Sequence, residues 1–291
     1  MKYTMANTDL KVLINSKGAE IQSITDKDGM EYLWQGDAAY WKGQAPNLFP
    51  FIGRLTEGQY SVANENYKMP NHGFMKLSEF QVKEQKEDKI VFSLNSNEVT
   101  KEQYPFDFEV CVVYQLEGKK IGISYVVENT GDTNMYFAIG GHPGFNIPLD
   151  EAVCFEDYYL EFSAVSNPKL IGLSDDCYVT GNDVPYALKD DNKILMQHNL
   201  FDRDAIVLKE MCKEVTLKSD KGNRQVTVTY PDMNYLGIWH MPKTDAPYVC
   251  IEPWTSLPSR KDVIEDLQTK EDMIELPAEE MYVNAWQIEI K

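Results

Sequence analysis

Four segments of this 291-residue chain combine glycine or proline with an aromatic residue and one ionisable side chain. Glycine and proline shape tight corners of the backbone and allow another group to approach closely. Corners of this kind can hold reactive side chains at the lip of a sheet. The segments are APNLFPFIGRL (45–55), MPNHGFMK (69–76), GGHPGFNIPL (140–149) and VCIEPWTSLPSR (249–260), which carry Arg54, His72, His142 and Glu252 respectively.

Glu252 and His142 have the residue types of an acid/base pair. Glu252 follows the apolar run 249–251 and precedes Pro253, so we expect it to be partly desolvated at a strand end. Desolvation raises the pKa of a carboxyl group and makes it a better base. Histidine, with an ordinary pKa of ~6.5, suits the acid role. Each residue also has a structural interpretation, as a solvated glutamate or as a histidine that fits a corner.

Taken together, these residues suit a polar, neutral, ring-shaped ligand, because aromatic faces pack on the C–H faces of sugars and charged groups bond their hydroxyls. The sequence contains no phosphate-binding glycine loop and no GxSxG nucleophile motif. His72 and His142 lack the spacing of a helical metal site, and the five cysteines form no CxxC pair. We therefore expect neither a metal nor another cofactor.

Strand patterns dominate the elements that must position these side chains. Apolar residues alternate on both sides of short polar turns at 110–127 and 215–230, which predicts two β-hairpins. Further strands are expected at 60–70, 89–96 and 281–290, a short helix near 262–268, and a solvated turn at 83–89. With no repeat and no linker, residues 1–291 are expected to form one all-β domain, a large antiparallel β-sandwich.

Composition restricts the partners and the compartment. The net charge of −18 argues against nucleic acid, whose phosphates require clustered Lys and Arg. No apolar run approaches the ~20 residues needed to span a bilayer, and residues 1–10 do not resemble a signal peptide. Five widely spaced cysteines fit a reducing cytosol, so we expect a cytoplasmic protein. A monomer and a homodimer both remain open.

On NLFPFIGRL, NHGF, GGHPGFN and CIEPW, in that order, the sequence resembles the aldose 1-epimerase (galactose mutarotase) family, especially its LacX-like branch. The segment FDRDAIVL (201–208) is similar to the aspartate-containing segment of that family. The resemblance implies a mutarotase-type β-sandwich with a cofactor-free site in a cleft on one sheet. It implies Glu252 as general base, His142 as general acid, and His72 as a polarising group near the ring oxygen. The sugar-binding residues that it implies are Arg54, Asp202, Asn71, Asn146, Trp239 and Trp254.

The function expected from this resemblance is interconversion of the α and β anomers of a free aldohexose by ring opening and re-closure. One alternative is 1-epimerisation of a hexose 6-phosphate, which requires extra cations near the sugar C6; Arg203 and Arg260 are candidates. The other is a non-catalytic carbohydrate-binding or regulatory protein, which would not need the acid/base pair. Many family members carry arginine where this chain has Lys76, a point donor instead of a planar fork.

Overall fold

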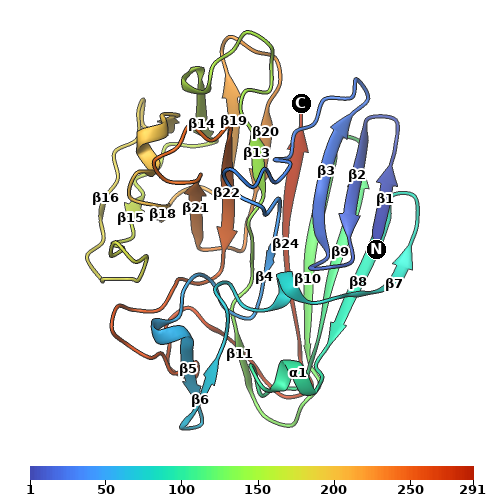
Figure 1. Cartoon of the computed structure of the whole chain (residues 1–291), viewed down its shortest axis with the longest axis vertical. Helices are drawn as coiled ribbons and strands as arrows, with labels where there is room; N and C mark the ends of the chain where they lie inside the picture. Colours follow the sequence, from blue (N-terminus) through green and yellow to red (C-terminus); the bar gives the residue numbers. More distant parts are fainter.

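The computed structural model describes residues 1–291 and contains two large antiparallel sheets that enclose a common core (Figure 1). The larger sheet has nine strands. In spatial order they are β17 (Lys193–Leu195), β14 (Tyr158–Phe162), β19 (Glu214–Ser219), β20 (Val226–Thr229), β24 (Met281–Ile290), β10 (Lys120–Asn129), β9 (Phe108–Glu117), β8 (Lys89–Asn95) and β7 (Gln81–Gln85).

The second large sheet has eight strands and carries the ends of most candidate site segments. In order they are β16 (Val184–Pro185), β15 (Lys169–Leu170), β18 (Ile206–Lys209), β21 (Tyr235–Trp239), β22 (Tyr248–Trp254), β12 (Gly140–Gly141) and β4 (Asn47–Leu48), with β13 (Gly144–Asn146) also paired to β22.

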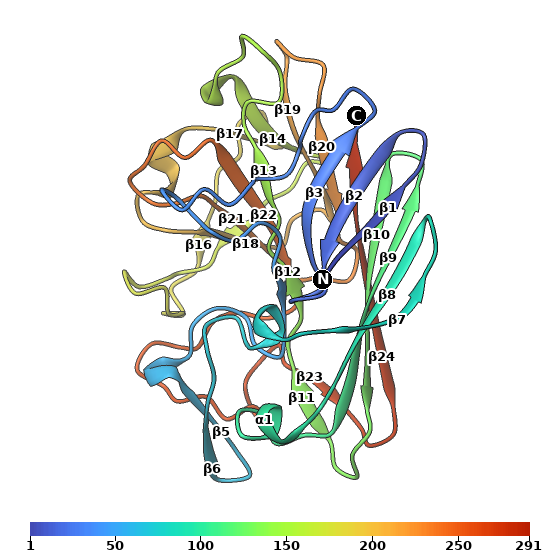
Figure 2. The ribbon, with the colours of Figure 1, turned by 45° about the vertical axis from the view of Figure 1, so that its right-hand side comes forward.

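Three small sheets and five short helices complete the fold. The sheet of β1–β3 lies beside β7–β10 (Figure 2), where Tyr3 meets Phe92 edge to face. The small-sheet strands are β1 (Lys2–Ala6), β2 (Leu10–Asn15), β3 (Glu20–Asp26), β5 (Gln59–Val62), β6 (Glu65–Lys68), β11 (Met135–Phe137) and β23 (Ile274–Leu276). The helices are α1 (Glu98–Lys101) and the 3-10 turns Thr56–Gly58, Met75–Leu77, Phe155–Asp157 and His198–Phe201.

The expected all-β sandwich is confirmed, and both predicted hairpins are present as β9–β10 and β19–β20. Their alternation corresponds to burial: on β10, Ile121, Ile123 and Tyr125 are fully buried, while the residues between them are partly exposed. Such alternation arises because successive strand side chains point to opposite faces. One core of 65 buried residues runs from Met5 to Ile290, and the single domain expected over residues 1–291 stays a prediction.

Two predicted elements were wrong. Residues 81–85 form β7, the charged edge strand of the large sheet, so the turn predicted at 83–89 shrinks to the link between β7 and β8. Charged side chains are common on edge strands because they discourage further pairing. No helix forms at 262–268, because Ser61 of β5 donates its N–H to Glu265 and accepts the N–H of Leu267.

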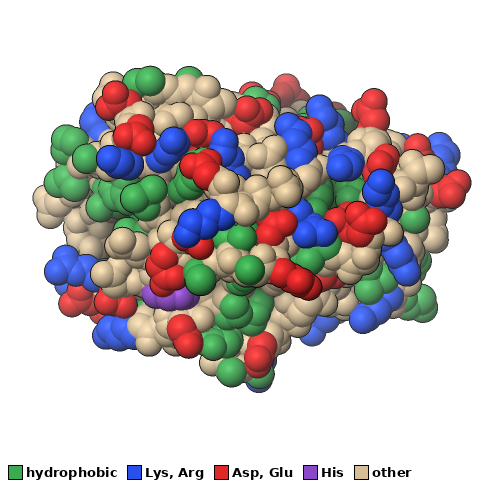
Figure 3. All heavy atoms as spheres, turned by 90° about the horizontal axis from the view of Figure 1, so that it is seen from above, with side chains coloured by type: hydrophobic (Ala, Val, Ile, Leu, Met, Phe, Trp, Pro, Cys, Tyr) green, Lys and Arg blue, Asp and Glu red, His purple; other side chains and the backbone are tan.

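The surface is mixed in charge. One face shows acidic and basic side chains interspersed, without a large basic patch (Figure 3). No helix is long and apolar enough to cross a membrane.

A buried asparagine connects several layers. Asn47 of β4 donates its side-chain amide to the carbonyls of Gly18 and Ala19 and to the Tyr114 hydroxyl. The Tyr125 hydroxyl donates to Asn47 Oδ1 at 2.8 Å. This network joins the β2–β3 turn, strands β9 and β10 of the large sheet, and β4.

Because Asn47→Leu leaves several buried polar groups unpaired, at ~1–3 kcal/mol each, we expect it to lower the free energy of unfolding by about 3 kcal/mol or more. Urea denaturation followed by tryptophan fluorescence measures this. Asn66→Leu, at an exposed position of β6, serves as the control and should change stability by less than ~0.5 kcal/mol. A loss below about 1 kcal/mol in Asn47→Leu would show that the network is dispensable.

Candidate active site

The eight-stranded sheet aligns His142 and Glu252 in one row across its strands. Gly140 pairs with Trp254 and Gly144 pairs with Cys250, so the same register places His142 directly opposite Glu252. Glu252 in turn pairs with Gly237 of β21. Residues paired across neighbouring strands point to the same face. The histidine is therefore a cross-strand neighbour of the glutamate, although 109 residues lie between them in the chain.

His142 and Glu252 are in contact at the floor of a cleft. His142 Nε2 lies 3.1 Å from Glu252 Oε2, and the glutamate is only 1% exposed. The angle between them is not that of a hydrogen bond, so Glu252 Oε2 has no hydrogen-bond partner. His142 Nδ1 and Trp254 Nε1, two further buried atoms at this site, also lack partners. Buried polar atoms are normally paired, so this cluster is suited to a polar ligand.

Glycine makes room for the glutamate. A Cβ at position 237 would come within 3.2 Å of the Glu252 Cβ and 2.9 Å of the Trp254 ring. The absence of a side chain at Gly237 therefore lets both side chains lie against β21. The segment that carries His142 is also held on the side away from Glu252, where the His142 N–H donates to the carbonyl of Pro46.

Burial shifts the pKa of both members of the pair away from ionisation. Desolvation raises the pKa of Glu252 well above its ordinary value, and the negative charge of Asp204 adds to the effect. Desolvation also lowers the pKa of His142, and the nearby positive charge of Lys76 acts in the same direction. The raised pKa of Glu252 agrees with the desolvation that we expected from its apolar neighbours in the sequence. Together the shifts favour a pair with no net charge.

His72 lies beside His142 with its orientation defined by the backbone. The two rings meet edge to face, with centroids 5.4 Å apart. The N–H of Gly53 donates to His72 Nδ1 at 3.1 Å, so in the neutral ring the proton resides on Nε2. Burial lowers the pKa of His72 well below its ordinary value, which favours this neutral form. His72 therefore offers an N–H donor.

Aromatic rings form the walls of the cleft, whose volume is about 320 Å³. Trp41 stacks on His142 at 4.8 Å between centroids, and Trp239 meets the same histidine edge to face at 5.8 Å. Trp254 also lines the cleft. Sequence reasoning missed Trp41. The pattern that could have indicated it is a tryptophan two residues before Gly43, close to the start of the segment 45–55.

Two cationic side chains face the histidines from the rim. Arg54 and Lys76 both line the cleft, and their charges lower the pKa of His72. Burial lowers the pKa of Lys76 itself, partly offset by Glu20. Asn71, also predicted from the sequence, lines the cleft at an exposed position.

Two predicted sugar-binding residues lie elsewhere. Asp202 is exposed at the end of the 3-10 turn His198–Phe201, whereas Asp204, two residues later, lines the cleft. The backbone of Asp204 is left-handed, at φ 80°, where the chain turns into β18. The Asn146 amide donates to the carbonyls of Glu31 and Leu33, so this residue connects β13 to the segment after β3 instead of lining the cleft.

One group of side chains is dense enough to hold a metal ion. The ligand atoms of His142, Cys250 and Glu252 all lie within 4.8 Å of one another. Cys250 and Glu252 share a face because they are two residues apart on β22. Burial raises the pKa of both the thiol and the carboxyl group, so metal binding would have to displace protons from both.

Comparisons with known proteins show which family the chain belongs to. The aldose 1-epimerase family matches residues 1–262. The plasmid and chromosomal LacX proteins of Lactococcus lactis subsp. lactis are 36% identical over 272 residues, 88% of this chain and of each relative. A galactose mutarotase related enzyme from Lactobacillus acidophilus superposes with a TM-score of 0.95 at 34% identity, covering 100% of this chain and 97% of that one. A galactose mutarotase-like protein from Lactobacillus casei gives 0.95 at 30% identity with full coverage of both chains. The chain belongs to the aldose 1-epimerase family.

Proposed function

We propose that the protein interconverts the α and β anomers of a free aldohexose without a cofactor. The observation that carries this proposal is the contact between His142 and Glu252, 3.1 Å apart beneath a cleft walled by tryptophan rings. This arrangement supplies an acid, a base and stacking surfaces at one point. Membership of the family supports an epimerase acting on aldoses.

Anomer exchange requires two coupled proton movements. Ionised Glu252 removes the proton from the C1 hydroxyl, while protonated His142 gives a proton to the ring oxygen. The C1–O5 bond breaks and leaves an open-chain aldehyde. Rotation about C1–C2 presents the other face of the aldehyde, and the reverse proton transfers close the ring with C1 inverted. Each positioned acid or base contributes roughly 10²–10⁴-fold.

The contact between the two side chains balances the protons within one turnover. Before ring opening, the pair consists of a carboxylate and an imidazolium. After ring opening, it consists of a carboxylic acid and a neutral imidazole, which holds the same number of protons. Ring closure restores the first form, so no proton need come from solvent. Both forms carry the same total number of protons, so the neutral pair that burial favours and the ion-paired form differ only in where one proton resides.

The surrounding residues bind and orient the sugar in this proposal. His72 donates its Nε2–H near the ring oxygen, where it stabilises the charge that develops during ring opening. Trp41 and Trp239 pack on the C–H faces of the ring. Arg54 and Asp204 bond hydroxyl groups, and Asp204 takes the role that the sequence had assigned to Asp202.

Glu252→Gln should retain sugar binding but lower kcat by about 10²-fold or more, because it removes the base and keeps the shape. Polarimetry of freshly dissolved α-glucose and α-galactose, corrected for spontaneous mutarotation, measures the rate. Thermal stability at neutral pH should be unchanged or higher. Burial raises the pKa of Glu252, so above the unfolded-state pKa its ionisation favours the unfolded chain, and glutamine removes that cost.

Glu265→Gln is the matched control, since Glu265 is also 1% exposed but is ion-paired with Arg260 away from the cleft. It should lower stability and leave the rate on glucose near wild type. Turnover within a few-fold of wild type in Glu252→Gln would remove this residue from the mechanism.

The pH profile should have a broad plateau, because only the total number of protons on the pair matters. The lowered pKa of His142 moves the acid limb below pH ~6.5, and the raised pKa of Glu252 moves the alkaline limb well above pH ~4.5. We therefore expect a nearly constant enzymatic rate between about pH 5 and 7. The charged or titratable groups facing the pair are Asp204, Cys250, Lys76 and His72.

Asp204→Asn tests the origin of the alkaline limb. Removal of its negative charge should lower the pKa of Glu252 and move that limb to lower pH. A wild-type profile with a single midpoint near the ordinary pKa of either residue would contradict a coupled buried pair.

His142→Asn should reduce kcat more than it raises KM, because the lost proton donor acts in the transition state. His72→Asn should affect both, since His72 binds the ring as well as polarising it. His240→Asn, at a fully buried histidine that does not line the cleft, controls for loss of packing. If His142→Asn matches wild type by polarimetry, GGHPGFN is only a structural corner.

Epimerisation of a hexose 6-phosphate is the second candidate. It is favoured by the two cations, Arg54 and Lys76, at the rim of the cleft. Polarimetry with glucose 6-phosphate and galactose 6-phosphate beside the free sugars decides between them. Sugar binding without any acceleration would instead support the non-catalytic alternative.

The cellular location remains a prediction. All five cysteines are free thiols, which is compatible with the cytoplasmic protein that we expected from the sequence.

A further inference from the structure

The imidazole of His142 is oriented by neighbouring rings and not by hydrogen bonds. Its backbone N–H donates to Pro46, but Nδ1 has no partner in another residue, and the contact of Nε2 with Glu252 lacks the geometry of a hydrogen bond. A functional histidine is commonly oriented through a hydrogen bond on its other ring nitrogen. In this site, packing must therefore hold the proposed acid.

Trp41 covers one face of that imidazole. The two rings are stacked, with centroids 4.8 Å apart and planes inclined by 24°. Trp239 and His72 meet the imidazole at steep angles instead, 82° and 75°. Rotation of the imidazole about its Cβ–Cγ bond would drive its edge into the stacked indole. The stack with Trp41 is therefore the contact that fixes the plane of the acid.

Two glycines on different segments make room for the indole. A Cβ at Gly43 would collide with the Trp41 ring, and a Cβ at Gly144 would lie 3.2 Å from it. Neither glycine has a left-handed backbone, so what glycine provides at both positions is space. The loop is held as well, because Trp34 Nε1 donates to the Trp41 carbonyl at 2.8 Å. The backbone of two segments is thus shaped to seat this indole.

The same stack favours the protonated acid. The face of an indole attracts a cation within about 6 Å of its centroid, and the attraction is larger where water is excluded. In the proposed mechanism His142 passes through the imidazolium form, with its side chain 11% exposed. Desolvation and the charge of Lys76 both oppose this form. Trp41 and ionised Glu252 act in the other direction.

We propose that Trp41 is a positioning residue for the acid: its indole fixes the plane of the His142 imidazole and stabilises the imidazolium that gives its proton to the ring oxygen. The inference rests on the proposed function for the role of His142, whereas the stack and the two glycines are independent observations. It goes beyond the use of Trp41 as a surface for the sugar. A surface acts on substrate affinity, and a positioning residue acts on turnover.

A double-mutant cycle measures whether Trp41 acts through His142. Polarimetry of α-glucose gives kcat and KM for Trp41→Leu, for His142→Asn and for the double variant. We expect Trp41→Leu to lower kcat by about tenfold and to change KM by less than about threefold, because the orientation and charge of the acid matter in the transition state. In the His142→Asn background the same substitution should have little further effect, since no imidazole is left to hold. Trp41→Phe keeps a ring face and should recover most of the lost turnover.

Tyr40→Leu is the matched control. Tyr40 lies in the same loop, does not line the cleft, and donates its hydroxyl to Asp245. Its kcat and KM should stay near those of wild type. If Trp41→Leu loses the native near-ultraviolet circular dichroism, Gly43→Ala replaces it in the cycle, because the added Cβ displaces the indole and keeps its chemistry.

Proton NMR of the imidazole C–H groups tests the stack without turnover. The chain has only four histidines, and His142→Asn identifies the signals of His142. The ring current of the stacked indole should move these signals upfield in the wild-type protein, and Trp41→Leu should remove that shift.

Three results would overturn the positioning role: signals of His142 that Trp41→Leu leaves in place, a rise in KM with kcat unchanged, or an equal loss of turnover with and without His142. An upfield shift in a protein that does not accelerate anomer exchange would contradict the proposed function instead, with the stack itself confirmed.

Discussion

The hydrogen bonds of Asn47 are the constraint on which the arrangement of the site depends. Its side chain binds the turn before β3 and the hydroxyls of Tyr114 and Tyr125. The Tyr125 hydroxyl also lies 3.0 Å from the carbonyl of Gly140, two residues before His142. One buried amide therefore ties the nine-stranded sheet to the strand that carries the proposed acid. Because every member of the network is buried, a shift of β4 would leave several polar groups unpaired.

The position of His142 follows from this attachment. Asn47 pairs with Gly141, so β12 is held between β4 and β22. Because β4 and β22 hold β12 on its two sides, the His142 side chain meets Glu252 of β22 as a cross-strand neighbour. Cross-strand placement explains why two residues so distant in sequence meet, with Glu252 buried and His142 nearly so. Burial then shifts both pKa values toward an uncharged pair, which suits a reaction that moves one proton in each direction.

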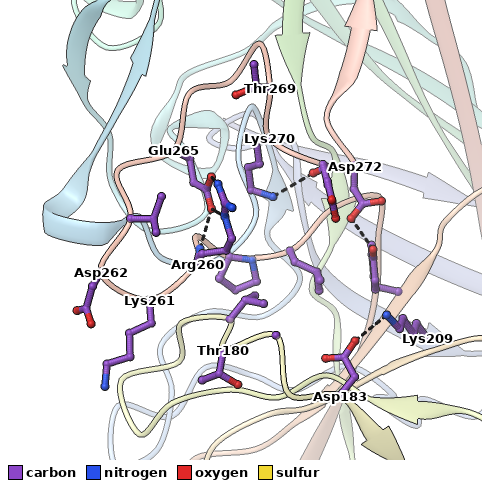
Figure 4. A pocket seen from close by; sticks show the side chains of 17 residues that line it. Thr180, Asp183, Lys209, Arg260, Lys261, Asp262, Glu265, Thr269, Lys270 and Asp272 are labelled. Carbon is purple, nitrogen blue, oxygen red and sulfur yellow. Dashed lines mark hydrogen bonds and ion pairs between the residues drawn. The ribbon is translucent and has the colours of Figure 1, made fainter.

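The electrostatics of the cleft differ from those of the whole chain. The protein carries a net charge of −18, yet Arg54 and Lys76 face the histidines at the rim of the cleft. In a neighbouring cavity of about 660 Å³, by contrast, Lys209 and Arg260 are each paired with a carboxylate (Figure 4). A ligand in the cleft would therefore meet positive side chains despite the negative charge of the whole molecule. Local geometry, and not net charge, therefore decides the choice of ligand.

Features that depend on short-range pattern could be predicted from the sequence alone. Alternation on β9, β10, β19 and β20 identified their strands, since one face of each strand is buried. The glycine- and proline-rich blocks identified His72, His142 and Glu252, which the structure brings together. The expected rise in the pKa of Glu252 also followed from its apolar neighbours.

Which side chains face the cleft depends on contacts between distant parts of the chain. Asp202 and Asp204 lie in the same sequence segment, and no local pattern distinguishes them. Asp204 adopts a left-handed backbone conformation just before β18 and lines the cleft. Asn146 belongs to a matching block but bonds to the segment after β3, and Trp41 belongs to no block but stacks on His142. The segment 262–268 has a helical pattern, yet its backbone bonds to Ser61 of β5. These outcomes depend on partners that are distant in sequence, so no local pattern contains them.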